Sequence, residues 1–115
     1  MLGAAIIAYT IVEFFYKENS TNRPKITEAE SAVRYAQRIG HRYPKGEPII
    51  LTDPEWTYWY ARNVIRGAWI AGESVLAQDS ELAYWYIKGV IAHDDVAIIR
   101  FKKLWKHADE YGLSI

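Results

Sequence analysis

Three histidines are the residues in this sequence best suited to acid–base or metal chemistry, and they are His41, His93 and His107. None belongs to a Glu-x-x-His or His-x-x-x-His pair, the spacing that places two metal ligands on one helix face. The run His93-Asp94-Asp95 could bind a cation or relay a proton, but adjacent residues at a helix start point in different directions, and capping accounts for the aspartates. With no cysteine, Gly-rich phosphate loop or nucleophile elbow, the chain is expected to be no enzyme and to have no catalytic residue, metal site or cofactor.

Recognition by aromatic and cationic side chains is the second kind of chemistry that the sequence suggests. Trp59 and Trp85 lie 26 positions apart on the polar side of two expected helices, and Arg34 is their counterpart in an earlier helix. Trp and Arg often dominate the binding energy of protein interfaces. The predicted partner-binding ridge consists of Arg34, Trp59, Arg62, Arg66, Trp85 and Lys88. The simpler interpretation, which we favour for each Trp, is packing against the neighbouring helical unit.

Local clusters of basic residues suggest a third possibility. The chain has 14 Lys plus Arg and 14 Asp plus Glu, and this zero net charge excludes a whole-molecule DNA mimic and a generally cationic nucleic-acid or membrane binder. If two local clusters converge, they could hold a phosphate backbone or an acidic protein surface. Otherwise they are solvated faces balanced by nearby acids. The clusters are Arg34, Arg38, Arg42 and Lys45, and Arg100, Lys102, Lys103 and Lys106.

An internal repeat must position these residues. Segment 53–65, DPEWTYWYARNVI, returns 26 positions later as segment 79–91, DSELAYWYIKGVI. The connecting stretch 41–50 matches 67–76 at the same spacing, and an earlier copy begins near Glu28. Such self-similarity is typical of stacked helical arrays, because a single unit cannot bury its apolar face alone.

Each copy begins with residues that favour a helix start. Asp53 and Asp79 can accept the free N–H groups of a first turn, and Pro54 suits the first helical position. After Asp53, the apolar side chains fill one arc of a helical wheel, with Thr57 as its only polar member, and Gly67 is placed to end the helix. The sequence therefore predicts a long helix, a turn and a short second helix in each unit.

The N-terminal segment, residues 1–17, is mostly apolar. Its only charged side chains are Glu13 and the final residue, Lys17. It is shorter than the roughly 20 apolar residues that a membrane span needs, and it lacks the basic start of a signal peptide. We expect a helix buried in the core or in a dimer contact, with a membrane anchor as the alternative.

The last segment, residues 94–112, departs from the repeat, and Asp94 or Asp95 is expected to start a C-terminal capping helix there. The predicted fold is all-α, a short array of stacked helical repeats with capping helices at both ends. It forms a single domain over residues 1–115, with an N-terminal helix at 1–17, two to three repeats at 28–92 and a capping helix at 94–112.

The pattern Asp-Pro-Glu-Trp-x-Tyr-x-Tyr-Ala-x-x-Val-Ile-x-Gly-x-Trp, followed by a Glu-containing turn, resembles a short tandem helical repeat of bacteriophage and large-virus proteins, mostly of unassigned function. The resemblance covers about residues 28–91. The usual Trp-Pro after the helix is Tyr43-Pro44 in one copy and Trp69-Ile70 in the next, and it is absent from the last. The resemblance implies a small phage accessory protein and supplies no catalytic residues.

We therefore expect a non-enzymatic, cytoplasmic protein-binding protein without membrane association. Its sharpest form is a phage protein that binds and blocks a host factor, such as a host defence complex, by means of the Trp and Arg ridge. The first alternative is a nucleic-acid binder that uses the basic clusters. The second is a structural or assembly protein that forms homo-oligomers through its apolar first helix.

Overall fold

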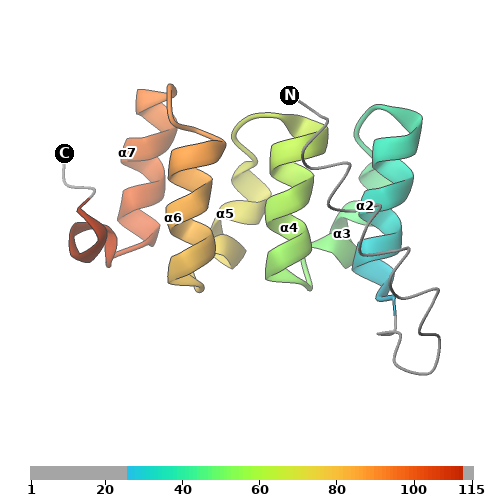
Figure 1. Ribbon diagram of the computed structural model, residues 1–115, viewed down its shortest axis with the longest axis horizontal. Coiled ribbons are helices and arrows are strands. Elements are labelled where there is room, and N and C mark those ends of the chain that lie inside the picture. The colour runs from blue at the N-terminus through green and yellow to red at the C-terminus, as the bar shows by residue number, and fades with distance from the viewer. Residues whose placement is uncertain (1–25, 113–115) are drawn as a thin grey trace, which may run out of the picture.

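The computed structural model describes residues 26–112, and the regular secondary structure there is entirely helical (Figure 1). The all-α class is therefore confirmed, since this part of the chain has no strand. The expected N-terminal helix at residues 1–17 lies outside the described residues. The α-helices are α2 (Glu28–Ile39), α3 (Glu47–Ile50), α4 (Pro54–Tyr60), α5 (Ile70–Leu76), α6 (Ser80–Gly89) and α7 (Asp95–Leu104). Three shorter turns of helix join or follow them: η2 (Pro44–Gly46), the π-helical η3 (Ala61–Ile65) and η4 (Ala108–Tyr111).

Aspartate side chains start three of these helices, as the sequence predicts. Asp53 Oδ1 accepts the backbone N–H of Glu55 at 3.1 Å at the start of α4, and Asp79 Oδ1 accepts the N–H of Glu81 at 3.0 Å at the start of α6. Asp94, rather than Asp95, caps α7. Each cap satisfies backbone donors that have no partner within the helix.

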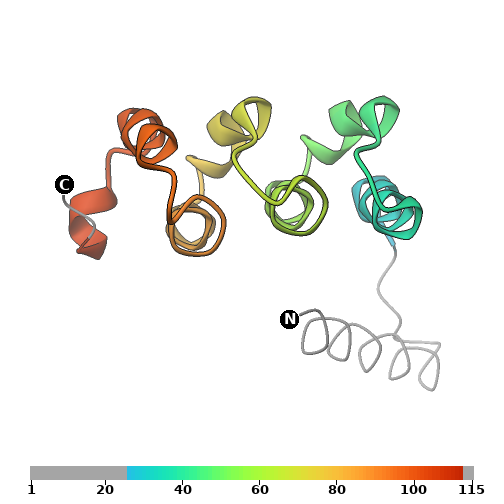
Figure 2. The ribbon, with the colours of Figure 1, turned by 90° about the horizontal axis from the view of Figure 1, so that it is seen from above.

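The helices form two rows (Figure 2). One row contains α2, α4 and α6, which run in the same direction (Figure 1), and the other contains α3, α5 and α7. Although the sequence of α7 departs from the repeat, α7 lies in the row of α3 and α5. The molecule extends over 47 Å along its longest axis. The core between the rows includes the fully buried side chains of Ile50, Tyr60, Leu76, Tyr86, Phe101 and Trp105.

The helix that begins at Pro54, formed by α4 and η3, does not end at the glycine that the sequence predicts. The residue with the left-handed backbone is Arg66, at a φ of 61°, and not Gly67. After Tyr60 the helix widens into the π-helical η3, and the carbonyl of Ala61 accepts the N–H groups of both Arg66 and Gly67. The helix therefore ends at Ile65, and the left-handed residue that follows it is one position before Gly67.

The C-terminal segment 94–112 contains two helices instead of one. Helix α7 ends at Leu104 because Trp105 takes an extended conformation, with φ of −100° and ψ of 98°. The indole of Trp105 is buried, and its Nε1 donates to Ser80 Oγ at 3.1 Å, so packing on the start of α6 fixes this break. Its function as a cap for the array stays a prediction.

Two equivalent hydrogen-bond junctions connect consecutive units. In the first junction, the Tyr60 hydroxyl donates to Glu47 at 2.6 Å and accepts the backbone N–H of Tyr43 at 2.8 Å. In the second junction, the Tyr86 hydroxyl donates to Glu73 at 2.7 Å and accepts the N–H of Trp69 at 3.0 Å. Burial and the neighbouring glutamate raise the pKa of Tyr60 to about 12, and the same two causes raise the pKa of Tyr86.

A glycine precedes the glutamate of each junction because no side chain fits there. A Cβ at Gly46 would lie 2.6 Å from the Tyr43 ring. A Cβ at Gly72 would lie 2.8 Å from both the Trp69 ring and the Thr57 methyl group. The Thr57 hydroxyl donates to the carbonyl of Ile50 at 2.9 Å, which satisfies the one polar member of the predicted apolar arc.

Candidate partner-binding groove

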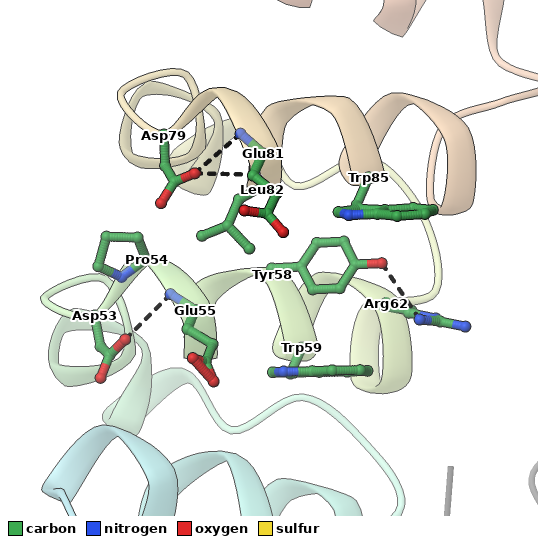
Figure 3. Close-up of a pocket in the computed structure, with 10 residues that line it drawn as sticks. All are labelled: Asp53, Pro54, Glu55, Tyr58, Trp59, Arg62, Asp79, Glu81, Leu82 and Trp85. Carbon is green, nitrogen blue, oxygen red and sulfur yellow. Dashed lines mark hydrogen bonds between the residues drawn. The ribbon is translucent and has the colours of Figure 1, made fainter. Parts of the chain in front are cut away.

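A groove of about 640 Å³ runs between the parallel helices α4 and α6 (Figure 3). The lining residues recur at spacings of three and four along each helix, so they belong to one face of α4 and one face of α6. The lining residues are Asp53, Pro54, Glu55, Tyr58, Trp59 and Arg62 from the α4 side and Asp79, Glu81, Leu82 and Trp85 from the α6 side.

Aromatic rings form the middle of the groove. Figure 3 shows the indole rings of Trp59 and Trp85 on opposite sides of the Tyr58 ring. Tyr58 is buried and meets Trp59 edge to face, with ring centroids 5.2 Å apart. Trp85 is 49% exposed, which is unusual for so large an apolar side chain in a well-packed fold. The rings therefore offer two walls and a floor to a ligand.

The two ends of the groove carry opposite charge. Asp53, Glu55, Asp79 and Glu81 gather at the start of the helices, and Arg62 lies at the other end (Figure 3). The Arg62 guanidinium lies 5.4 Å from the centre of the Trp59 ring and donates to the Tyr58 hydroxyl at 3.3 Å. These contacts fix Arg62 at the mouth of the groove while leaving most of its five N–H donors for other acceptors.

Of the six predicted ridge residues, the structure brings three together in the groove: Trp59, Arg62 and Trp85. Arg34 lies on α2 and forms an ion pair with Glu30 at 2.7 Å. Arg66 and Lys88 are exposed near the ends of η3 and α6 and do not line the groove. The predicted ridge is therefore divided, because Arg34 belongs to a helix on the other side of α4 (Figure 1).

The groove also contains residues that are not part of the predicted ridge. Tyr58 lies on the apolar arc of the helical wheel, and it is both buried and the floor of the groove. Glu55, in the first turn of α4, lines the groove, as does its counterpart Glu81 in the first turn of α6. The available signal was the repeat itself, because equivalent residues on parallel neighbouring helices line the same groove.

The two tryptophans differ in burial, and a partner-binding role for either stays a prediction. Trp59 is partly buried and packs against the core, as expected for a residue that mediates stacking. Trp85 is half exposed and meets Tyr84 edge to face at 5.2 Å. Within the described residues the counterparts of Tyr58, Trp59 and Arg62 on α2 are Val33, Arg34 and Gln37, so the aromatic walls belong to the α4–α6 pair.

The two basic clusters do not converge. One lies on α2 and the turn after it, the other on and after α7, at opposite ends of the rows (Figure 1). Several of their arginines already have partners within the chain. Arg42 pairs with Glu47 at 2.8 Å, Arg100 pairs with Glu73 at 2.6 Å, and Arg38 lies 5.6 Å from the centre of the Tyr35 ring.

Residues 26–112 contain no group of three or more His, Asp or Glu side chains that could hold a metal ion. Over the same range no helix is both long enough and apolar enough to cross a membrane. Comparison of the chain with protein-family models, with curated proteins and with solved structures found no match.

Proposed function

We infer that this chain is a non-enzymatic protein-binding module whose contact surface is the α4–α6 groove. The observation that carries this conclusion is the half-exposed Trp85 facing Trp59 across a groove that also holds Arg62. Trp, Tyr and Arg clustered around a concavity are the residues that dominate binding energy at protein interfaces.

The resemblance to the phage repeat supplies the narrower form of the proposal. In that form, a phage accessory protein in the host cytoplasm covers the surface of a host factor, such as a defence complex, and blocks it by occlusion. Occlusion needs a rigid surface and no reacting group. Helices that are held together by the two Tyr–Glu junctions can provide such a surface.

Nucleic-acid binding has less support. Proteins that bind single strands combine aromatic platforms with a positively charged groove, whereas here four carboxylates share the groove with one guanidinium. The separated basic clusters would also have to contact a phosphate backbone independently.

Affinity capture from host-cell lysate, followed by mass spectrometry, tests the protein-binding function. The Trp85→Ala variant should lose the captured partner while keeping its melting temperature, because the ring is half exposed. The matched control is Ile70→Ala, which removes an exposed apolar side chain from α5, outside the groove. Recovery of the same proteins with wild type and Trp85→Ala would show that the groove is not the contact surface.

A further inference from the structure

The groove has a definite charge pattern, and that pattern restricts its ligand. At one end, Glu55 and Glu81 are exposed and occupy equivalent first-turn positions of α4 and α6. Figure 3 shows their carboxylates between the capped helix starts and the aromatic rings. Because the two helices are parallel, the pair of carboxylates faces any segment that lies along the groove.

The aspartates at this end accept backbone N–H groups of their helices, whereas the glutamate side chains are exposed to solvent. Asp79 Oδ1 accepts the N–H groups of Glu81 and Leu82 at 3.0 and 3.1 Å, and Asp53 Oδ1 caps α4 in the same manner. The caps offset the positive ends of the helices. Glu55 and Glu81 therefore set a negative potential at this end, and a cation is the complementary group.

The middle and the far end define the rest of the ligand. The Trp walls and the Tyr58 floor favour an apolar or aromatic side chain. At the far end, the Arg62 guanidinium favours a carboxylate or a backbone carbonyl. Glu55 and Arg62 are seven residues apart, which is about 10 Å along a helix, and an extended peptide covers that distance with about three residues.

We propose that the α4–α6 groove binds an extended segment of the partner protein that has a Lys or Arg at one end, an apolar residue in the middle and an acceptor at the other end. This inference rests on the proposed protein-binding function and names the chemistry of its partner. The cation pairs with Glu55 and Glu81, the apolar side chain lies between Trp59 and Trp85, and the acceptor meets Arg62.

Selection from a random peptide library with the full chain tests the proposal. The expected peptides carry Lys or Arg about three residues from an acid or a C-terminal carboxylate, with an apolar residue between them. Fluorescence anisotropy of a selected peptide should show affinity about tenfold weaker in the Glu55→Gln/Glu81→Gln variant, which is the effect of two ion pairs at an interface rim. Added salt should weaken wild-type binding more than binding to the variant, in which only the Arg62 contact with the peptide carboxylate remains.

The matched control is Glu28→Gln/Asp95→Asn, which removes two exposed first-turn acids from α2 and α7. It changes the net charge and the helix-dipole interactions equally but leaves the groove intact. Equal losses in the two double variants would overturn the proposal, because the effect would then arise from net charge.

The remaining outcomes separate this inference from the proposed function. Selection of peptides without a basic residue, with binding lost in Trp85→Ala, would overturn the partner chemistry and leave the groove as a protein-binding site. Failure to select any peptide, or preferential binding of an oligonucleotide or a second copy of the chain, would also overturn it. If partner capture were in addition unaffected by Trp85→Ala, the proposed function would fail as well.

Discussion

The two Tyr–Glu junctions are equivalent in sequence, yet they obtain their arginine from opposite directions along the chain. In the first junction, Arg42 reaches Glu47 from five residues upstream, and its guanidinium donates two hydrogen bonds. In the second junction, Arg100 reaches Glu73 from 27 residues downstream, also with two hydrogen bonds. The repeat determines the tyrosine and the glutamate but not the cation, since Arg42 aligns with Ala68 and Arg100 lies after the repeats.

This difference changes what each junction holds together. Glu73 is 1% exposed and Arg100 35%, whereas Glu47 is 15% exposed and Arg42 51%. The second junction ties α5, α6 and α7 to one carboxylate, while the first ties only α3 and α4, with Arg42 supplied by the turn after α2. Because removal of one partner from a buried pair leaves the other group without a partner and away from water, breaking the second junction should cost more stability than breaking the first.

The largest expected effect is therefore in the second junction. Glu73→Ala should reduce the free energy of unfolding by about 3 kcal/mol, because it leaves Arg100 and the Tyr86 hydroxyl without their buried acceptor. Glu47→Ala should cost less, about 2 kcal/mol, since the Tyr60 hydroxyl also loses its acceptor but water replaces the lost partner of the exposed Arg42. Urea unfolding of both variants measures the two losses, and equal losses would remove the distinction between the junctions.

The glycines of the junctions give the next test. Gly72→Ala should destabilise the protein by about 2 kcal/mol, because the new methyl group meets Trp69 and Thr57, which are both buried. Gly46→Ala should cost less, although its contact is shorter, because the partly exposed Tyr43 ring can turn aside. Thermal unfolding of the pair checks the order, and a reversed order would mean that the first junction is the more rigid one.

The stability contributed by the first junction, the less buried of the two, should also depend on pH. The Arg42 guanidinium holds the pKa of the Glu47 carboxyl below its usual value of 4.5, which means that folding favours the ionised form. Glu47 then contributes stability above about pH 4.5, and this contribution is lost as the pH falls through the lowered pKa. The difference in unfolding free energy between wild type and Glu47→Gln, about 1 kcal/mol at neutral pH, should shrink toward pH 3. A difference that is constant with pH would contradict this account.

The smallest effect concerns the turns that lead into the junctions. Gly40 and Arg66 both have a left-handed backbone, with φ of 80° and 61°, and they lie 26 positions apart. Arg66→Gly should stabilise the protein by about 0.5 kcal/mol, because only glycine adopts this conformation without strain. Gly40→Ala should cost about 1 kcal/mol by the same mechanism, since a Cβ there meets nothing within 4 Å. Guanidinium unfolding compares them, and a loss of stability in Arg66→Gly would show that the arginine side chain makes a stabilising contact.

The parts of this structure that could be predicted from sequence depend on local interactions. The aspartate caps act within one turn, so Asp53 and Asp79 could be assigned from neighbouring residues alone, and the cap of α7 could be narrowed to Asp94 or Asp95. The burial of Tyr58 and Tyr60 follows from helical periodicity. The turn at Arg66 could not be predicted, because Gly67 is the stronger signal and the π-helical η3 shifts the end of the helix by one residue.

The parts that could not be predicted depend on contacts between elements. The pairing of Arg100 with Glu73 joins residues that no repeat spacing relates. Trp59 and Trp85 could be matched by the repeat, but their meeting across one groove requires that α4 and α6 lie side by side and parallel. Arg34 was added to the same ridge because the repeat gives its position on a helix and does not say which neighbour that face meets.

The row arrangement has a consequence for how the chain folds. The hydrogen bonds that join neighbouring elements in this way connect residues 13, 17, 25 or 27 positions apart, so no contact between distant ends of the chain has to form first. Low contact order of this kind favours fast folding, and assembly can begin at any helix pair and extend to its neighbour. Amide hydrogen exchange should then be slowest where the second junction ties three helices and should be faster toward α2, which lies beyond the less buried first junction.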